Sequence, residues 1–402
     1  MLLNRERADR VMDEHGLAAL VASSPMNVYY LTDWQTEAGW SFPGVSSAVV
    51  PRDHRRPAAV LTVDVDTEFP QARDAAWVEE VRPYHGMSTL VLRHAAAAST
   101  GDLVDAPVEL QGSPADPTAA VGAFLDEIDL AGARVGFEDP WFGQRVRDGW
   151  LQRLEVVPAV DLLRDIRMVK TPGELALMRS AARKTELAQL ACIEAVAAGA
   201  AWAEAQRVFF SVMTQMGGDP LYMAGTVARP NVGPLSGNDA LEHLAGDTAF
   251  FDGFGGYRRY YGDVGRTVVF GEPNERQRIV FAALRAGWRD TWPHIRPGLD
   301  SRELAAMVMR HVRAAGAADY QICSPHSVGL EHFDNPHPRS IYEPFKVEAG
   351  MVLSVDVPFM APDTGMLHTE DLVLVGDSGV EFLTSNDDRL FVAVDGSLHR
   401  LD

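Results

Sequence analysis

The chain has few cysteines and fewer basic than acidic residues, and each of these properties disfavours a class of protein. Its 402 residues contain two cysteines, Cys192 and Cys323, which allow at most one disulfide and lack the spacing of a cysteine zinc site. Because unpaired cysteines are usually buried, we predict two reduced thiols in the core. Lys and Arg number 36 against 56 Asp and Glu, and the resulting net charge of -20 disfavours a nucleic-acid partner.

Long apolar segments and targeting signals are also missing. The most apolar helix-like stretch, residues 187–205, is interrupted by Gln189, Glu194 and Glu204, so it is not expected to span a membrane. Residues 1–16 lack the apolar core and cleavage site of a signal peptide. These absences predict a cytoplasmic protein without a membrane partner.

Residues 1–165 have the pattern of an α/β domain. They contain no P-loop, nucleophile elbow or dinucleotide-binding glycine motif. Apolar runs bounded by turn residues predict strands at 17–23, 27–34, 46–51, 57–63 and 134–139. Helices are predicted near the start of the chain, at 119–128 and in a stretch ending near Trp150, and residues 99–117 have the composition of a surface loop.

A strong helix start marks the entry to a second domain, predicted as residues 166–402. Thr171, Pro172 and Glu174 have the spacing of a capping box with proline at the first helical position, ahead of a long helical pattern. Further helical periodicity follows at 203–216, 275–292 and 301–315. Helices therefore alternate with strand-rich segments in each half of this domain.

The stretch Thr248–Phe270 predicts an apolar hairpin that carries two carboxylates, Asp252 and Asp263. If the hairpin closes near Tyr257 and Arg258, the two side chains face each other within about 5 Å at Cβ. A turn at Gly255 and Gly256 would instead oppose Asp252 to Arg259. Facing carboxylates in an apolar sheet repel each other and lose hydration, and a cation between them relieves both penalties.

A second hairpin follows about a hundred residues later. Its strands, 349–358 and 366–375, place Asp356 and Glu370 nearly symmetrically about Asp363, and His326 lies between the two hairpins in the chain. Four carboxylates and one imidazole make an oxygen-rich ligand set. Such a set suits pairs of Mn, Co, Fe or Zn ions better than a structural Cys/His zinc site.

The order of these motifs is similar to that of the pita-bread metallohydrolases, which are the prolidases, aminopeptidases P, methionine aminopeptidases and the metal-free creatinases. The similarity rests on two aspartates eleven residues apart, H-x-V-G-L at His326, G-M-V-x-x-V-D-x-P at Asp356 and T-E-D at Glu370, and it covers the whole chain. It implies a non-catalytic α/β domain that supports a homodimer. An α+β pita-bread catalytic domain with pseudo-twofold symmetry would follow.

The same resemblance implies roles for individual residues. Two divalent metal ions, Mn, Co, Zn or Fe, would be held by Asp252, Asp263, His326, Asp356 and Glu370. Arg266 and Thr267 would hold the Asp263 carboxylate. By the strand period of two, Asp371 points to the other sheet face, where it is expected to support the site or be solvated. His368 shares the face of Glu370, so it either reaches the pocket or makes a structural hydrogen bond.

The chain also departs from the family pattern. Asp356 stands where the family has Glu, so its carboxylate is one methylene shorter. Ile322 and Phe333 occupy two positions where relatives carry substrate-contacting histidines, and the segment 226–239 lacks a third. His332 lies one place early and would serve only if its loop is re-spaced; the alternative is an ordinary loop histidine. Much of the prolyl-peptide recognition set is therefore lost.

The implied reaction is cleavage of an amide C–N bond by a metal-bridged hydroxide, in the manner of Xaa-Pro dipeptidases and aminopeptidases. Asp356 would shuttle the proton, and His332 or His368 would stabilise the intermediate. A second hypothesis is a small-molecule C–N hydrolase or lyase, of creatinase-like, ectoine-hydrolase-like or dimethylsulfoniopropionate-lyase-like type. Aromatic residues that could contact a cationic substrate favour it: Trp34, Trp40, Tyr222, Tyr257, Tyr260 and Tyr261. The third hypothesis is a metal-free binding protein that has kept the fold.

Overall fold

The first part of the chain is built around a six-stranded sheet with the order β4-β3-β2-β1-β5-β6. β1 pairs antiparallel with β2 and parallel with β5, so the sheet is mixed. Its strands are β1 (Ala19–Ala22), β2 (Ser47–Pro51), β3 (Ala59–Val63), β4 (Glu80–Tyr84), β5 (Arg134–Phe137) and β6 (Glu155–Pro158). The helices are α1 (Arg5–His15), α2 (Pro25–Thr32), α3 (Glu37–Ser41), η1 (Asp64–Glu68), α4 (Pro70–Ala75), α5 (Pro117–Glu127), α6 (Pro140–Gly149) and α7 (Val160–Met168).

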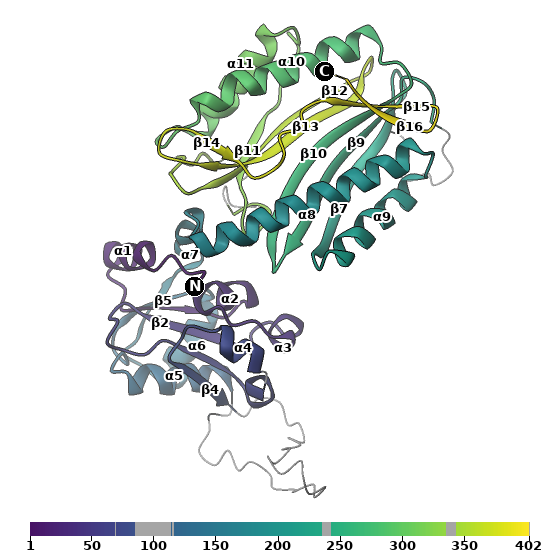
Figure 1. Ribbon diagram of the computed structural model, residues 1–402. Helices are drawn as coiled ribbons and strands as arrows, with labels where there is room; N and C mark the ends of the chain where they lie inside the picture. The colour runs from purple at the N-terminus through teal and green to yellow at the C-terminus, as the bar shows by residue number, and fades with distance from the viewer. Residues whose placement is uncertain (69, 85–113, 115, 235–242, 335–342, 402) are drawn as a thin grey trace, which may run out of the picture. The chain divides into compact units, whose positions relative to one another are not determined.

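This computed structural model describes residues 1–402 except 69, 85–113, 115, 235–242, 335–342 and 402 (Figure 1). The described residues form two compact units, Met1–Arg167 and Met168–Asp402. The predicted loop at 99–117 lies almost entirely outside the described residues, as does the end of segment 226–239. Among the helices of the described ranges, none has the length and apolarity needed to cross a membrane.

One strand prediction in the first unit is wrong. Residues 27–34 were expected to be extended, but α2 covers most of them. Ser24 caps the helix by accepting a hydrogen bond from the Asn27 backbone N–H, and Pro25 takes the first helical position. Because α2 is buried along almost its whole length, and its buried residues include the polar Asn27 and Thr32, polar and apolar side chains do not separate into two faces and the sequence shows no helical period.

The second unit contains a long curved sheet with the order β11-β12-β13-β10-β9-β7-β8, to which β14, β15 and β16 are attached. The strands are β7 (Asp219–Arg229), β8 (Gly233–Pro234), β9 (Thr248–Tyr257), β10 (Tyr260–Phe270), β11 (Ser324–Ser327), β12 (Val352–Ala361), β13 (Gly365–Val375), β14 (Val380–Phe382), β15 (Leu390–Val394) and β16 (Ser397–Leu401). The helices are α8 (Pro172–Ala197), α9 (Trp202–Gln215), α10 (Glu275–Thr291), η2 (Trp292–His294) and α11 (Ser301–Ala314).

Each half of the second unit repeats one arrangement, a pair of helices followed by a long hairpin. α8 and α9 pack against β7, β9 and β10, whereas α10 and α11 pack against β11, β12 and β13 (Figure 1). A separate apolar core fills each helix–sheet interface; Cys192 is buried in the first of them. This is the predicted α+β pita-bread fold with its internal repeat, following the α/β unit.

Helix α8 begins as its sequence predicts. The Thr171 side chain accepts a hydrogen bond from the Glu174 backbone N–H, and the Glu174 carboxylate accepts one from Thr171 N.

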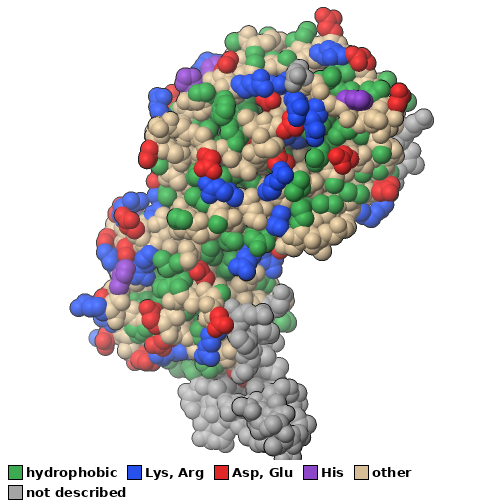
Figure 2. Space-filling model, in the orientation of Figure 1, with side chains coloured by type: hydrophobic (Ala, Val, Ile, Leu, Met, Phe, Trp, Pro, Cys, Tyr) green, Lys and Arg blue, Asp and Glu red, His purple; other side chains and the backbone are tan. Residues whose placement is uncertain are grey.

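Both cysteines are unpaired, and burial raises the pKa of the Cys192 thiol to about 12. On the face shown in Figure 2, acidic and basic side chains of the described residues are interspersed.

The first hairpin turns at a different place from either sequence expectation. Tyr257 pairs with Tyr260, so the turn residues are Arg258 and Arg259, both with positive φ, at 47° and 70°. Gly255 and its neighbour lie within β9, where Gly255 allows close packing of a helix. A Cβ atom at Gly255 would lie 2.4 Å from Thr185 Oγ1 of α8.

Candidate metal centre

A row of directly paired positions crosses four strands where the two hairpins meet. Asp252 of β9 pairs with Gly265 of β10, which pairs with Glu370 of β13, which pairs with Asp356 of β12. The predicted facing of Asp356 and Glu370 is confirmed. Directly opposed residues share a sheet face, so this row presents three carboxylates around a glycine.

Asp263 lies diagonally from Asp252 rather than opposite it. The turn at Arg258 and Arg259 pairs Asp263 with Phe254 and moves the expected register by two residues. Because the strand period is also two, Asp263 still points to the same face as Asp252. The predicted direct opposition is therefore wrong, but the predicted shared face is correct.

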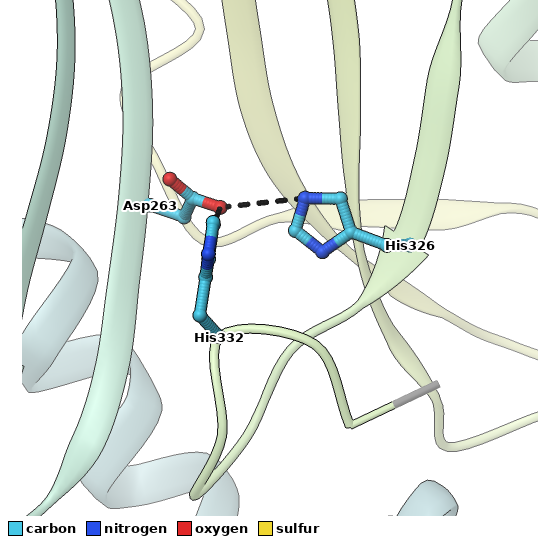
Figure 3. Close-up of side chains that lie close together, drawn as sticks. All are labelled: Asp263, His326 and His332. Atoms are coloured by element: carbon cyan, nitrogen blue, oxygen red, sulfur yellow. Dashed lines mark hydrogen bonds and ion pairs between the residues drawn. The ribbon is translucent and has the colours of Figure 1, made fainter. Parts of the chain in front are cut away.

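Two histidines approach the same carboxylate oxygen from different elements (Figure 3). His326 extends from β11, with its Nε2 3.6 Å from Asp263 Oδ2 and 3.6 Å from Asp356 Oδ2. His332 lies in the loop after β11, with its Nε2 3.0 Å from Asp263 Oδ2. The re-spacing needed for His332 to reach the site is present in the structure.

His368 also reaches the carboxylates. Its Nε2 lies 3.1 Å from Asp356 Oδ1 and 3.8 Å from Glu370 Oε2, and its ring stacks on Phe250. Gly265 makes room for this ring, because a Cβ atom there would lie 2.1 Å from His368 Cε1. The His368 ring therefore lies among the proposed ligands and forms a hydrogen bond with Asp356; its part in the reaction stays a prediction.

Ser354 fixes the Glu370 carboxylate. Its hydroxyl donates a 2.6 Å hydrogen bond to Glu370 Oε1, which leaves the other oxygen, Oε2, without a hydrogen-bond partner. Sequence reasoning missed Ser354 and Gly265. A signal for Ser354 was available, since it precedes Asp356 by two residues and so shares its face.

The expected support for Asp263 by Arg266 and Thr267 is wrong. Arg266 lies on the opposite sheet face, where it donates to Asp371 Oδ1 at 2.8 Å and to the Glu370 backbone carbonyl at 2.7 Å. Thr267 exchanges hydrogen bonds with the backbone of His368. Asp371 is buried on that face, so it supports β13 and is not solvated. These residues hold the strand that carries Glu370, and none of these bonds reaches the Asp263 carboxylate.

The acids and imidazoles strongly affect one another's protonation. Burial raises the pKa of Asp252 to about 7, with the neighbouring Asp263 charge adding to the effect. Burial and the charges of Asp263, Asp356 and Asp252 raise the pKa of Glu370 well above its usual range. Burial alone would lower the pKa of His326 and His368, but the surrounding carboxylates raise both pKa values. The two imidazoles also lower the pKa of Asp356 against the effect of burial, so it is the charges of Asp252 and Glu370 that remain poorly compensated.

The predicted ligands converge in overlapping groups. The donor atoms of Asp252, Asp263 and Glu370 lie within 4.8 Å of one another, and so do those of His326, Asp356 and Glu370. Buried donor atoms in these groups have no hydrogen-bond partner, namely Asp252 Oδ1, Asp263 Oδ1, Glu370 Oε2 and both ring nitrogens of His326. Since burial without a partner is costly, these atoms fit a site for divalent cations.

Residues 176–377 match the model of metallopeptidase family M24, and so cover half of the chain. The chain belongs to this family. Residues 4–169 also match the creatinase/prolidase N-terminal domain. Membership in family M24 makes the protein a metallohydrolase, and a metallopeptidase family implies divalent metal ions.

Individual family members are distant in sequence. A Xaa-Pro dipeptidase of Pyrococcus furiosus is 27% identical over 233 residues, which are 57% of this chain and 67% of that protein. Among solved structures, a Xaa-Pro dipeptidase from Bacillus anthracis matches with a TM-score of 0.73 at 19% identity, over 96% of this chain and 98% of the other. The prolidase from Pyrococcus horikoshii OT3 gives a TM-score of 0.68 at 19% identity, over 95% and 97%. These two structures show the shared fold.

Few of the six aromatic residues singled out in the sequence lie beside this M24 centre. Tyr261 stacks on His332 at 6.1 Å between ring centroids, and Tyr222 packs on Phe254, which itself contacts His332 at 3.9 Å. Tyr260 is buried with its hydroxyl on Glu174, and Tyr257 lies under the Lys184 ammonium. Trp34 is buried in the other unit.

Proposed function

We propose that this protein is a dinuclear metal-dependent hydrolase that cleaves an amide C–N bond in short peptides of the Xaa-Pro type. The observation that carries the proposal is the pair of overlapping donor groups that share Glu370, with buried donor atoms that lack partners. Family membership and the Xaa-Pro dipeptidase of Pyrococcus furiosus support the peptide substrate.

In this proposal Asp252, Asp263, His326, Asp356 and Glu370 hold two divalent ions. Ions bound there supply Lewis acidity toward a carbonyl and lower the pKa of water. Asp356 would take up a proton and return it to the leaving nitrogen, and His368 Nε2, 3.1 Å from Asp356 Oδ1, holds this carboxylate in place. Ser354 keeps Glu370 oriented by its hydrogen bond to Oε1.

A small-molecule C–N substrate is the second candidate. It is favoured by Phe333, whose ring stacks on His326 at 4.1 Å where relatives are expected to carry a substrate-contacting imidazole. The other replaced position, Ile322, is 58% exposed and offers no hydrogen bond either. A metal-free binding protein is disfavoured, because the buried carboxylates would then repel without compensation.

The test combines metal analysis with a substrate comparison. Protein stripped of metal and reloaded separately with Mn, Co and Zn is assayed against Xaa-Pro dipeptides and against a panel of small amides. We expect about two ions per chain and hydrolysis of the dipeptides. Hydrolysis of small amides alone would favour the second candidate, and an absence of bound metal would contradict both.

The matched variants are D263N and D290N. Asp263 belongs to the donor groups, whereas Asp290 is exposed on α10. We expect D263N to lose metal and to lower activity by at least about a hundredfold, and D290N to behave like the unmodified protein. Full activity and full metal content in D263N would contradict the ligand assignment.

A further inference from the structure

His332 forms a third donor group with Asp263 and His326, which takes one member from each of the two groups that share Glu370. The ligand atoms of these three residues lie within 4.8 Å of one another. Figure 3 shows both imidazoles directed at the Asp263 carboxylate from different sides. Their ring centroids are 5.0 Å apart and the ring planes are nearly perpendicular, at 82°. Two ring nitrogens and one carboxylate oxygen thus converge on one point.

The loop that carries His332 is held in place by buried contacts. Asp334 donates its backbone N–H to the Ser327 carbonyl at 2.9 Å, which closes the loop onto β11. Its carboxylate pairs with the Lys170 ammonium at 3.0 Å, and both side chains are almost fully buried. Gly329 is required next to it, because a Cβ atom there would lie 2.0 Å from Asp334 Oδ2. The position of His332 is therefore built into the fold.

The His332 ring is held on its other side by an aromatic contact. It packs on Phe254 of β9 at 3.9 Å between centroids. Phe254 is the residue paired with Asp263 across the hairpin, so the same register that places the carboxylate also places the ring that supports His332. About a quarter of the His332 side chain is exposed, at 23%.

We propose that His332 is a direct ligand to the ion held by Asp263 and His326, in place of the catalytic role that its sequence position suggests. This inference rests on the proposed metal centre. It increases the asymmetry of the centre: one end would have two imidazoles and the shortened Asp356, and the other end, at Asp252, would have carboxylates alone. Imidazole favours Zn, Fe, Ni or Cu, whereas carboxylates favour Mn or Mg, so the two ends would differ in metal preference.

The alternative is that His332 only donates a hydrogen bond to Asp263. The variants H332F and H332Q separate the two. Phenylalanine keeps the packing on Phe254 but has no nitrogen, while the glutamine amide can still donate a hydrogen bond to Asp263 but is a poor zinc ligand. H294Q is the control, because His294 is an exposed histidine of the same unit.

The experiment uses the full chain, stripped of metal and loaded with one equivalent of zinc. X-ray absorption at the zinc edge counts the imidazoles bound to the ion, and competition with a chromophoric chelator gives its dissociation constant. We expect two imidazoles in the unmodified protein and in H294Q, but one in H332F and H332Q. The zinc dissociation constant should rise at least about tenfold in both His332 variants.

A count of one imidazole in the unmodified protein, with H332Q binding zinc as tightly, would overturn the inference and leave the proposed function standing. No zinc bound at all would instead contradict the proposed function itself. Thermal melting of the metal-free variants shows whether they fold, and a count of one in the unmodified protein overturns the inference even if they do not. Since His368 Nε2 lies 3.1 Å from Asp356 Oδ1, a count of two supports His332 only if it falls to one in H332F and H332Q.

Discussion

At the residue scale, one glycine, Gly265, makes room for an imidazole ring in the proposed metal centre. Gly265 lies between Asp252 and Glu370 in the row that ends at Asp356, and the His368 ring lies over it. A side chain at this position would displace the imidazole from Asp356. The absence of a Cβ atom is therefore as much a part of the site as the carboxylates.

We predict that G265A moves His368 away from Asp356 and lowers the free energy of unfolding by about 1–3 kcal/mol, the usual cost of overpacking a filled interior. Urea unfolding of the metal-free protein measures the stability, and chelator competition measures metal affinity, which should weaken. G379A is the control, since a Cβ atom at Gly379 meets no atom within 4 Å. Equal behaviour of the two variants would show that the ring is not confined as described.

The shortened carboxylate at position 356 gives a second prediction. Asp356 lies between His326 and His368, at 3.6 Å and 3.1 Å from their Nε2 atoms. D356E should keep its metal, with a dissociation constant changed by no more than about tenfold and an altered preference among Mn, Co and Zn. Elemental analysis after reconstitution measures both. Complete loss of metal uptake would contradict this prediction and would mean that the site has no room for the longer carboxylate.

At the element scale, the start of α8 contains a buried acid with an unusual pKa. Glu174 closes the capping box and accepts from the Tyr260 hydroxyl at 3.1 Å. Burial raises its pKa to about 7, the nearby Asp334 charge adds to this, and Lys170 opposes it. The folded protein therefore keeps a proton on Glu174 at pH values where the unfolded chain has released it.

The sign of the resulting pH dependence follows from this difference. Between pH 4.5 and about 7 the folded state binds the extra proton, so Glu174 makes stability fall as pH rises, by up to about 3 kcal/mol, and has no further effect above that range. E174Q cannot lose a proton and retains a residue suited to the capping box. The free energy of unfolding of E174Q minus that of the unmodified protein should therefore be larger at pH 8 than at pH 5, by about this amount. Urea unfolding at both pH values measures it, and an unchanged difference would contradict the assignment.

At the scale of the whole molecule, the chain forms two compact units, Met1–Arg167 and Met168–Asp402, and every proposed ligand lies in the second. We propose that these units correspond to the two predicted domains, 1–165 and 166–402. The predicted homodimer and the predicted cytoplasmic location stay predictions. Sedimentation of the purified protein would measure the oligomeric state.

This division predicts that metal stabilises only one unit. Calorimetry should show two transitions, and saturating metal at about 100 times its dissociation constant should stabilise residues 168–402 by about 2.7 kcal/mol. A chelator should reverse the shift of that transition and leave the other in place. Equal shifts of both transitions, or a single transition, would contradict independent units.

The sequence by itself determined the local features. The cap of α8, the helical periods of α8, α10 and α11, the carboxylates of the two hairpins and the facing of Asp356 and Glu370 all depend on short-range patterns. A strand period of two placed Asp252 and Asp263 on one face even though the turn was misplaced. The same local reasoning failed for α2, because a helix buried on all sides has no polar face to mark its period.

Only the tertiary structure decided which strands and side chains come into contact. The pairing of Gly265 with Glu370 joins residues 105 positions apart, and no local signal specifies it. That pairing brings the two hairpins together and leaves room for the His368 ring over Gly265. On the opposite face it places Arg266 beside Asp371. The place of His332 likewise depends on Lys170 and Phe254, which are distant in sequence. Long-range packing fixes these positions because the free energy of burial depends on which surfaces meet, which the residues of one segment do not specify.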